Sequence, residues 1–374
     1  MEYRSMDKIG EKVSLLGFGC MRFPKDEQGE IDEVLTEKML DEALKCGVNY
    51  IDTAYLYHNR TSEDALGKLL KKYDRSSYKL ATKLPDWILD SKEEAQKILE
   101  EQLSKLQTDY IDFYLLHALD ARRWEHIKKL ELVSLCRQWQ REGKIRHLGF
   151  SFHDGYEVFE EIIKAEDWDF CQIQLNYMDT DFQAGERGYR LTEELGIPLI
   201  VMEPIRGGML VNLPKDLAER FHQVDKEASL ASWALRWAAS HSNVKVILSG
   251  MSSYENVLDN LNTFKEYKPL GEEEAAAVRD VQKELLNRVK SRCTGCGYCM
   301  PCPFGVNIPE NFQFYNACSL FDDARSRRLY YGMGKTQSTA CRECGKCEKA
   351  CPQHIKIREE LKNVTDFFQP EEGC

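Results

Sequence analysis

Nine of the fourteen cysteines in this chain of 374 residues lie between Cys293 and Cys351, in or between two short runs. The first run reads CTGCGYCMPCP and the second reads CRECGKCEKACP. In each run three cysteines recur at every third position, and a fourth stands directly before a proline. Clustered cysteines in a reducing compartment are typical of metal ligands. Zinc sites use separated pairs of cysteines, so the repeated triplet before Cys-Pro favours iron–sulfur clusters over zinc.

A second set of residues has the chemistry of a general acid. Asp52, Tyr57, Lys83 and His117 stand at or just after the ends of three successive apolar runs. A phenol with an ordinary pKa of about 10 is a poor proton donor at neutral pH, but a neighbouring ammonium lowers that pKa. We expect Lys83 to supply this charge and Asp52 to hold Lys83. His117 then orients a substrate carbonyl, which accepts a hydride and takes its proton from Tyr57.

Eight short apolar runs predict the strands that position these side chains. Segments of helical length lie between the runs, with apolar residues recurring at intervals of three and four. Strands that alternate with helices pair in parallel, and eight units over about 250 residues fit an α/β TIM barrel better than a doubly wound sheet. The predicted strands are residues 13–19, 49–54, 78–84, 109–117, 145–151, 170–177, 198–204 and 244–250.

Charge and hydropathy exclude two classes of partner. The net charge is −11 with both signs interspersed, which predicts binding neither to nucleic acid nor to an anionic membrane surface. No run of some eighteen apolar residues is present, and the N-terminus lacks a signal peptide, so we expect a cytoplasmic protein. The isolated cysteines are expected to be small core residues: Cys20, Cys46, Cys136 and Cys171.

The motifs NYIDTAYLY, LATK, DFYLLH and LGFS resemble, in this order, the aldo-keto reductase superfamily over residues 1 to about 270. The resemblance implies that Asp52, Tyr57, Lys83 and His117 form the catalytic tetrad and that NAD(P)H lies extended over the mouth of the barrel. The cofactor phosphates would follow the segments EPIRGG and SGMSSYENV, where backbone amides favour anions. The implied cofactor-binding residues are Ser151, Gln172, Arg206, Gly207, Ser249, Gly250, Ser252, Asn256 and Asn260.

Four positions depart from the pattern of that superfamily. Phe152 stands where many members have an asparagine on the cofactor carboxamide, and Met202 replaces a tyrosine that stacks on the nicotinamide. Gly250 and Asn256 stand where NADPH-preferring members have lysine and arginine. These departures leave NADH, NADPH and a flavin open as the redox cofactor.

The cysteine runs resemble a bacterial ferredoxin with two 4Fe-4S clusters. The first run is one residue shorter before its last cysteine, and the long aromatic-rich segment between the runs predicts a mainly α-helical ferredoxin-like domain. Cys318, outside both motifs, is expected to be a buried thiol. The resemblance assigns one cluster to Cys293, Cys296, Cys299 and Cys351, and the other to Cys302, Cys341, Cys344 and Cys347.

We therefore expect a barrel over residues 1–270, a connecting helix over 271–290, and a two-cluster domain over 291–374. The expected function is an oxidoreductase that interconverts a small carbonyl compound and an alcohol, with the clusters relaying electrons to or from ferredoxin or another redox protein. A nicotinamide passes two electrons as hydride whereas a cluster passes one, so a flavin would have to split the pair. The alternatives are a conventional NAD(P)H carbonyl reductase with structural or redox-sensing clusters, and a non-enzymatic electron-transfer subunit.

Overall fold

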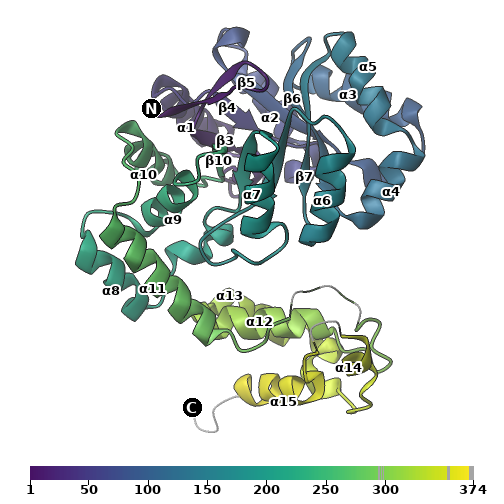
Figure 1. Ribbon diagram of the computed structural model, residues 1–374, viewed down its shortest axis with the longest axis vertical. Coiled ribbons are helices and arrows are strands. Elements are labelled where there is room, and N and C mark those ends of the chain that lie inside the picture. The colour runs from purple at the N-terminus through teal and green to yellow at the C-terminus, as the bar shows by residue number, and fades with distance from the viewer. Residues whose placement is uncertain (294, 296, 298, 352–353, 370–374) are drawn as a thin grey trace. The chain divides into compact units, whose positions relative to one another are not determined.

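The computed structural model describes residues 1–293, 295, 297, 299–351 and 354–369 (Figure 1). The chain divides into two compact units. The first comprises Met1–Val211 and Glu227–Ala275, and the second comprises Asn212–Lys226 and Ala276–Cys374.

The first unit is a closed barrel of eight parallel strands, which confirms all eight predicted strands and the TIM-barrel fold. Neighbouring strands in the barrel follow one another along the chain, and the last strand pairs with the first. The strands are β3 (Leu16–Gly19), β4 (Tyr50–Asp52), β5 (Lys79–Leu84), β6 (Ile111–Leu119), β7 (Ile145–Phe152), β8 (Phe170–Gln174), β9 (Leu199–Met202) and β10 (Val244–Ser249).

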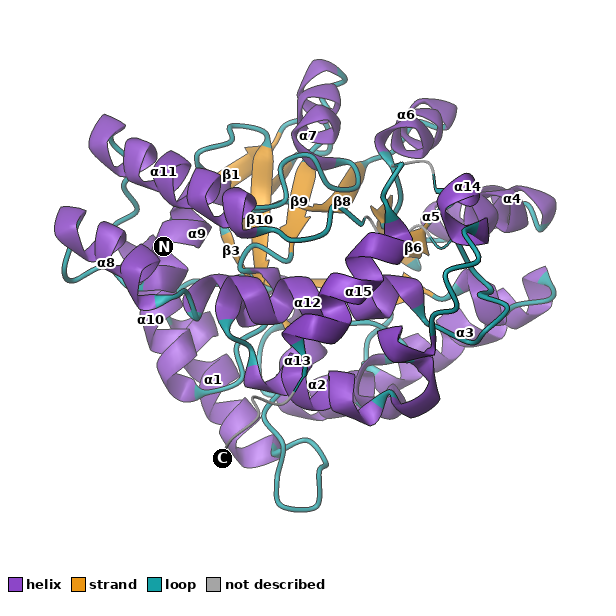
Figure 2. Ribbon diagram, turned by 90° about the horizontal axis from the view of Figure 1, so that it is seen from below, coloured by secondary structure: helices purple, strands orange, loops and turns teal. Residues whose placement is uncertain are grey.

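Helices surround these strands, which are coloured orange in Figure 2. Several helices begin at a side chain that accepts a hydrogen bond from the backbone of the first turn, for example Asp32 from Leu35 and Ser91 from Glu94. Such caps explain why the helices start where they do. The helices of this unit are α1 (Glu33–Lys45), α2 (Ser62–Leu70), α3 (Lys92–Lys105), α4 (Ala121–Lys129), α5 (Leu132–Arg141), α6 (Tyr156–Ala165), α7 (Gly185–Glu194), α9 (Leu230–Ala239) and α10 (Tyr254–Lys265).

A β-hairpin that the sequence did not predict precedes the barrel. It consists of β1 (Tyr3–Met6) and β2 (Glu11–Ser14). Its buried Met6 and Val13 belong to the same apolar cluster as Phe113 and Phe170 of the barrel interior. The expected strand 13–19 was therefore wrong at its start, because it joined the end of the hairpin to β3.

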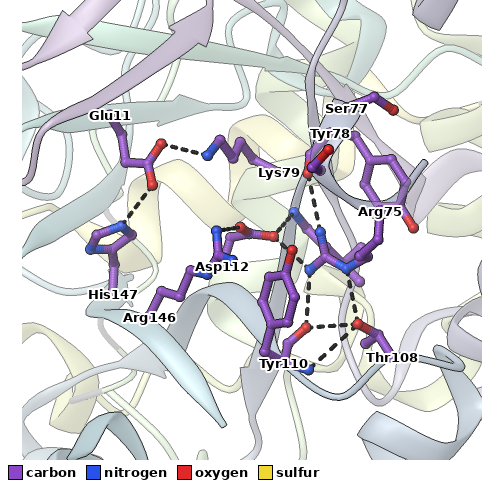
Figure 3. Close-up of polar contacts among 12 residues, drawn as sticks. Glu11, Arg75, Ser77, Tyr78, Lys79, Thr108, Tyr110, Asp112, Arg146 and His147 are labelled. Carbon is purple, nitrogen blue, oxygen red and sulfur yellow. Dashed lines mark hydrogen bonds and ion pairs between the residues drawn. The ribbon is translucent and has the colours of Figure 1, made fainter. Parts of the chain in front are cut away.

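Charged side chains form a network at the amino ends of the strands (Figure 3). The Asp112 carboxylate accepts hydrogen bonds from Arg75 (2.6 Å), Arg146 (3.2 Å) and the backbone of Leu80 (3.0 Å). Glu11 of the hairpin lies 2.6 Å from the Lys79 ammonium and 3.2 Å from His147 Nε2. Polar groups at this end of a TIM barrel serve stability, since active sites lie at the opposite end.

The second unit is helical in its described part, as the sequence predicted for the cysteine-bearing domain. Its core includes Phe312, Leu361 and Val364. The helices are α8 (Lys215–Val224), α11 (Glu272–Arg288), α12 (Ile308–Phe321), α13 (Ala324–Gly332), α14 (Lys346–Ala350) and α15 (Ile357–Phe367), with α11 starting in the first unit.

Residues 212–226, which the sequence placed within the barrel, group with this second unit. An ion pair of 2.6 Å joins Arg220 of α8 to Asp280 of α11, and Arg288 of α11 contacts Asp216 of α8. The apolar stripe of α11 is also buried, at Val278 among others. Helix α8 therefore belongs with α11 to the second unit, and not to the barrel.

Of the described cysteines outside the two runs, all but one are buried. Cys20, Cys136, Cys171 and Cys318 are buried as expected. The expectation for Cys46 was wrong, because this residue directly follows the last turn of α1 and is exposed. None of the helices within the described ranges has the length and apolar character needed to cross a bilayer.

Candidate active site

Lys83 joins two of the predicted tetrad residues at the carboxyl ends of β4 and β5. Its ammonium lies 2.6 Å from Asp52 Oδ1 and donates a further hydrogen bond of 2.7 Å to the carbonyl of Thr53. The Tyr57 hydroxyl lies 3.4 Å from the same nitrogen. Lys83 is fully buried and Asp52 is 3 % exposed, so the pair is held away from bulk water. The phenol at this site therefore faces a fixed positive charge.

The structure corrects the expected pKa of Tyr57. Burial raises the pKa of this phenol, and the nearby Lys83 ammonium opposes the rise without cancelling it. Burial also disfavours the charged form of Lys83, but its interactions with Asp52 and Tyr57 together outweigh burial and raise the pKa of Lys83. At neutral pH the phenol is consequently protonated, as a proton donor must be, and Lys83 stabilises the anion that forms when the proton leaves.

A β-bulge positions His117, the fourth predicted residue of the tetrad. The register between β6 and β7 shifts between Leu116 and Leu119, and Ala118 adopts a φ of +55°. The ring of His117 lies 6.2 Å from that of Tyr57 and 5.2 Å from that of Trp87. Burial lowers the pKa of His117 well below its ordinary value, so the imidazole is neutral and able to hydrogen-bond a carbonyl oxygen.

The tetrad opens into a pocket of about 640 Å³ at the carboxyl ends of the strands. Besides the four tetrad residues, eight of the nine predicted cofactor-binding residues line it. The ninth, Arg206, does not, because its guanidinium lies 2.9 Å from the Asp179 carboxylate instead. The eight lining residues are Ser151, Gln172, Gly207, Ser249, Gly250, Ser252, Asn256 and Asn260.

The two residues expected at the cofactor carboxamide have different environments. The Ser151 hydroxyl accepts a hydrogen bond of 2.7 Å from the backbone of Ala118, in the bulge that positions His117. The Gln172 amide donates to the sulfur of Met202 at 3.4 Å, while its oxygen Oε1 is buried and has no partner within the described residues. Gln172 is thus available as an acceptor for a ligand amide, and Met202 lies beside it in the pocket.

Among the further lining residues, four have ionisable side chains that the sequence analysis did not assign to the site: Arg22, His153, Glu203 and Asp259. Arg22 is exposed, and its side chain crosses Gly250 so closely that a Cβ at position 250 would lie 3.1 Å from Arg22 Cδ. Its guanidinium would meet a Cβ at Gly207 at 3.4 Å. Arg22 therefore spans the two loops that were expected to hold the phosphates. Its position three residues after the first barrel strand, β3, was the available signal.

The two cysteine runs share a backbone pattern. Gly295 and Glu343 occupy equivalent positions, both have positive φ, and their N–H groups point to the sulfur two residues earlier, at 3.5 Å from Cys293 and 3.4 Å from Cys341. Gly297 and Gly345 also correspond, with φ of +77° and +73°. Such N–H···S contacts stabilise thiolate ligands.

A cavity of about 140 Å³ lies between the runs in the second unit. It brings together cysteines from both runs, which is what two clusters with exchanged ligands require. Among described residues no three His, Cys, Asp or Glu side chains are close enough to hold a single metal ion. Cys296 falls outside the described residues. The cysteines that line the cavity are Cys299, Cys302, Cys344 and Cys347.

Comparisons with known proteins agree with this architecture. The aldo/keto reductase family model matches residues 15–283, and a 4Fe-4S dicluster domain model matches residues 292–355. The chain therefore belongs to the aldo/keto reductase family and carries a 4Fe-4S dicluster domain, so it is an oxidoreductase of the aldo-keto reductase type. The second match also favours iron–sulfur clusters over zinc.

Relatives and solved structures cover the barrel. The oxidoreductase YqkF of Bacillus subtilis is 25 % identical over 76 % of this chain and 97 % of its own length. L-galactose dehydrogenase of Arabidopsis thaliana is 26 % identical over 72 % of this chain and 90 % of its own. The structure of aldo-keto reductase AKR11C1 from Bacillus halodurans, in its holo form, matches with a TM-score of 0.61 and 28 % identity, covering 75 % of this chain and 96 % of that one.

Proposed function

We propose that the barrel interconverts a small aldehyde or ketone and the corresponding alcohol, with Tyr57 as the general acid and, in the reverse direction, the general base. The observation that carries this proposal is the contact of the Tyr57 hydroxyl with the buried Lys83–Asp52 pair at the base of the pocket. A proton leaving the phenol goes to the substrate oxygen, and Lys83 stabilises the phenolate. Neutral His117 holds the same oxygen by a hydrogen bond.

A bound nicotinamide would supply the hydride that the substrate carbon accepts or gives up. Ser151 and Gln172 would hold its carboxamide next to the tetrad, with Gly207, Ser249 and Gly250 near the diphosphate. Ser252, Asn256 and Asn260 line the far end, and Asn260 donates to the Ser249 hydroxyl at 2.7 Å. Arg22, rather than Arg206, would meet the diphosphate.

We propose NADH over NADPH as the preferred nicotinamide. The lining residues include two carboxylates, Glu203 and Asp259, in addition to Asp52. Lys83 is engaged by Asp52, so Arg22 is the cation available to phosphate among described lining residues. A 2′-phosphate would add negative charge without a second cation to receive it. The expected result is a kcat/KM for NADH at least about tenfold above that for NADPH, a difference of about 1.4 kcal/mol.

The eight cysteines of the two runs would hold two 4Fe-4S clusters, which supply transfer of single electrons. The proposed ligand sets are Cys293, Cys296, Cys299 and Cys351 for one cluster and Cys302, Cys341, Cys344 and Cys347 for the other. Three members of the second set line the common cavity, which supports that assignment. We propose that the clusters exchange electrons with a redox partner protein, and that a flavin splits the electron pair between hydride and cluster chemistry.

Anaerobic purification followed by iron, sulfide and flavin assays tests this proposal, with spectra recorded before and after NADH or NADPH is added. About eight irons per chain, a bound flavin and bleaching of the cluster absorbance on nicotinamide addition are expected. Equal iron content with nicotinamide-dependent carbonyl reduction but no bleaching would overturn the relay and leave a conventional reductase. A Tyr57→Phe variant that keeps full turnover would overturn the catalytic assignment.

A further inference from the structure

The cysteine-bearing part of the chain has a small excess of positive charge, although the protein as a whole is acidic. Residues 289–374 contain 12 lysines and arginines against 10 aspartates and glutamates. Residues 1–275 contain 36 against 50. The negative net charge of the protein thus comes from residues 1–275, and not from the region that carries the cysteine runs.

Four carboxylates of this region have partners within the domain. Glu348 pairs with Arg358 at 2.8 Å, and Asp323 caps α13 by accepting from the backbone of Ser326 at 3.0 Å. Glu310 accepts a hydrogen bond of 2.7 Å from Asn307, and Glu359 lies 3.6 Å from Lys356. The cations that these acids contact are Arg358 and Lys356, and not the cations of the second cysteine run.

The cations of the second cysteine run do not have such partners among the described residues. Arg342, Lys346 and Lys349 are all exposed, and none has a side-chain hydrogen bond or ion pair to any residue that the structure describes. Lys346 and Lys349 are on α14, the short helix that contains Cys347. Lysine side chains that stand free in water, one helical turn apart, present positive charge to a partner rather than to the fold.

Exposed apolar side chains accompany these cations. Met300, in the first run, is 36 % exposed, and Phe304, directly after that run, is 47 % exposed. Met300 lines the same cavity as Lys346, which places the two runs together at this surface. Cys344, on the cavity wall, is itself exposed. We call the surface formed by Met300, Phe304, Arg342, Lys346 and Lys349 the basic cysteine face.

We propose that the basic cysteine face is the docking surface for an acidic protein that carries one electron at a time. This inference rests on the proposed function of the clusters as an electron relay. An acidic carrier would be repelled by a protein of net charge −11 unless a local positive surface steered it. A few exposed apolar side chains accompanied by cations suit a small, transient redox interface.

The same cations have a competing role, which is to compensate the negative charge of a thiolate-ligated cluster. The two roles have different consequences. Charge compensation changes the reduction potential of the cluster and affects every electron donor alike. Docking changes the association rate of a charged protein donor, depends on salt, and leaves a neutral donor unaffected.

The test compares two charge-reversed variants of the full-length holoprotein. K346E/K349E reverses the proposed face. R279E/K283E reverses two exposed cations on α11 that likewise lack partners among the described residues, and it serves as the matched control. Stopped-flow spectroscopy under anaerobic conditions follows cluster reduction by a purified acidic bacterial ferredoxin at about 50 mM and about 500 mM salt, and by photoreduced deazaflavin, a neutral donor.

We expect K346E/K349E to slow reduction by ferredoxin about tenfold at low salt and less than about twofold at high salt, where charges are screened. The control variant should stay within about twofold of the wild type, and deazaflavin should reduce all three proteins equally. Equal ferredoxin rates in all three proteins would overturn the docking surface. A loss that deazaflavin shows as well, with a shifted cluster potential, would overturn it in favour of charge compensation.

A different measurement, carbonyl turnover supported by ferredoxin, tests the proposed function separately from the docking surface. If ferredoxin reduces the clusters with the expected salt and charge dependence but no carbonyl turnover follows, the relay to the barrel is wrong and the docking surface stands. If ferredoxin supports carbonyl turnover and K346E/K349E leaves its rate unchanged, the relay stands and the docking surface is wrong.

Discussion

The two ends of the barrel differ in how buried polar groups are paired. At the amino ends, both oxygens of Asp112 accept hydrogen bonds, and Glu11 contacts two basic side chains (Figure 3). At the carboxyl ends, buried atoms without a partner in the described chain include Asp52 Oδ2, His117 Nδ1 and both oxygens of Asp86. A buried polar atom without a partner costs free energy, so the carboxyl ends retain polar groups that stability alone would not favour.

The backbone shows the same difference. Three successive residues after β4, His58, Asn59 and Arg60, have positive φ although none is glycine. Ala118 near the end of β6 and Glu203 directly after β9 also have positive φ. At the amino ends, the left-handed residue Gln107 follows α3, where helices ordinarily end in this conformation. Backbone strain at the carboxyl ends is maintained by the surrounding structure, as is common at sites that bind and react. The comparison predicts that mutations at one end affect activity and those at the other affect stability.

The largest expected effect is on activity, for Tyr57→Phe. Removing this hydroxyl removes the proton donor and should lower kcat for carbonyl reduction about 1,000-fold, with the melting temperature of the barrel unchanged. Tyr110→Phe, at the amino ends, is the matched control and should keep kcat within about twofold. Steady-state kinetics and thermal unfolding of both variants test this prediction. A large loss of kcat in the control would contradict the expected difference between the two ends of the barrel.

Asp112→Ala should have the largest effect on stability. The substitution leaves Arg75, Arg146 and the Leu80 amide without their shared acceptor, which should cost about 3 kcal/mol and lower the melting temperature of the barrel by roughly 6–12 °C. The kcat of the folded enzyme should not change. Asp109→Ala, at an exposed neighbouring position, should leave both quantities unchanged. A normal melting temperature for Asp112→Ala would show that this network does not stabilise the barrel.

Asp86→Asn tests the unpaired carboxyl beside Trp87. Burial raises the pKa of Asp86 from 3.8 to about 7. The folded state then binds this proton more tightly than the unfolded state, so the wild type loses stability as pH rises from about 4 to 7. Asparagine has no carboxyl group that ionises, so the variant does not lose this stability as the pH rises. Urea unfolding should show a gain for Asp86→Asn that is larger at pH 8 than at pH 5 by about 2 kcal/mol, and no such gain for the exposed control Asp90→Asn.

Glu11→Gln should have the smallest effect and the opposite pH dependence. Burial acts to raise the pKa of Glu11, but Lys79 and His147 outweigh it and lower that pKa below 4.5. A carboxyl group whose pKa is lowered by folding stabilises the fold at pH values above its pKa in the unfolded chain. This stabilisation disappears as the pH falls through the pKa of the group in the folded protein. The variant should lose about 0.5–1 kcal/mol at pH 7 and nothing near pH 3. A loss that persists at pH 3 would contradict an electrostatic origin.

Much of the barrel was predictable because its signals are local. Each of the eight strands is a short apolar run, and Asp52, Lys83, Ser151 and Gln172 lie at or near the ends of such runs. The hairpin before the barrel was missed because β2 and β3 are separated by a single residue, Leu15, which gives no break in hydropathy. Cys46 was misjudged because its exposure depends on where α1 ends.

The sequence alone determined the number and order of the strands, the candidates for the tetrad and the family of the cysteine runs, since these depend on periodicity and on spacing along the chain. Only the tertiary structure decided that Arg206 pairs with Asp179 while Arg22 crosses the phosphate loops, and that burial outweighs Lys83 in setting the pKa of Tyr57. The same holds for the grouping of α8 with α11. These outcomes depend on which side chains, distant in sequence, meet in space and how much water is excluded between them.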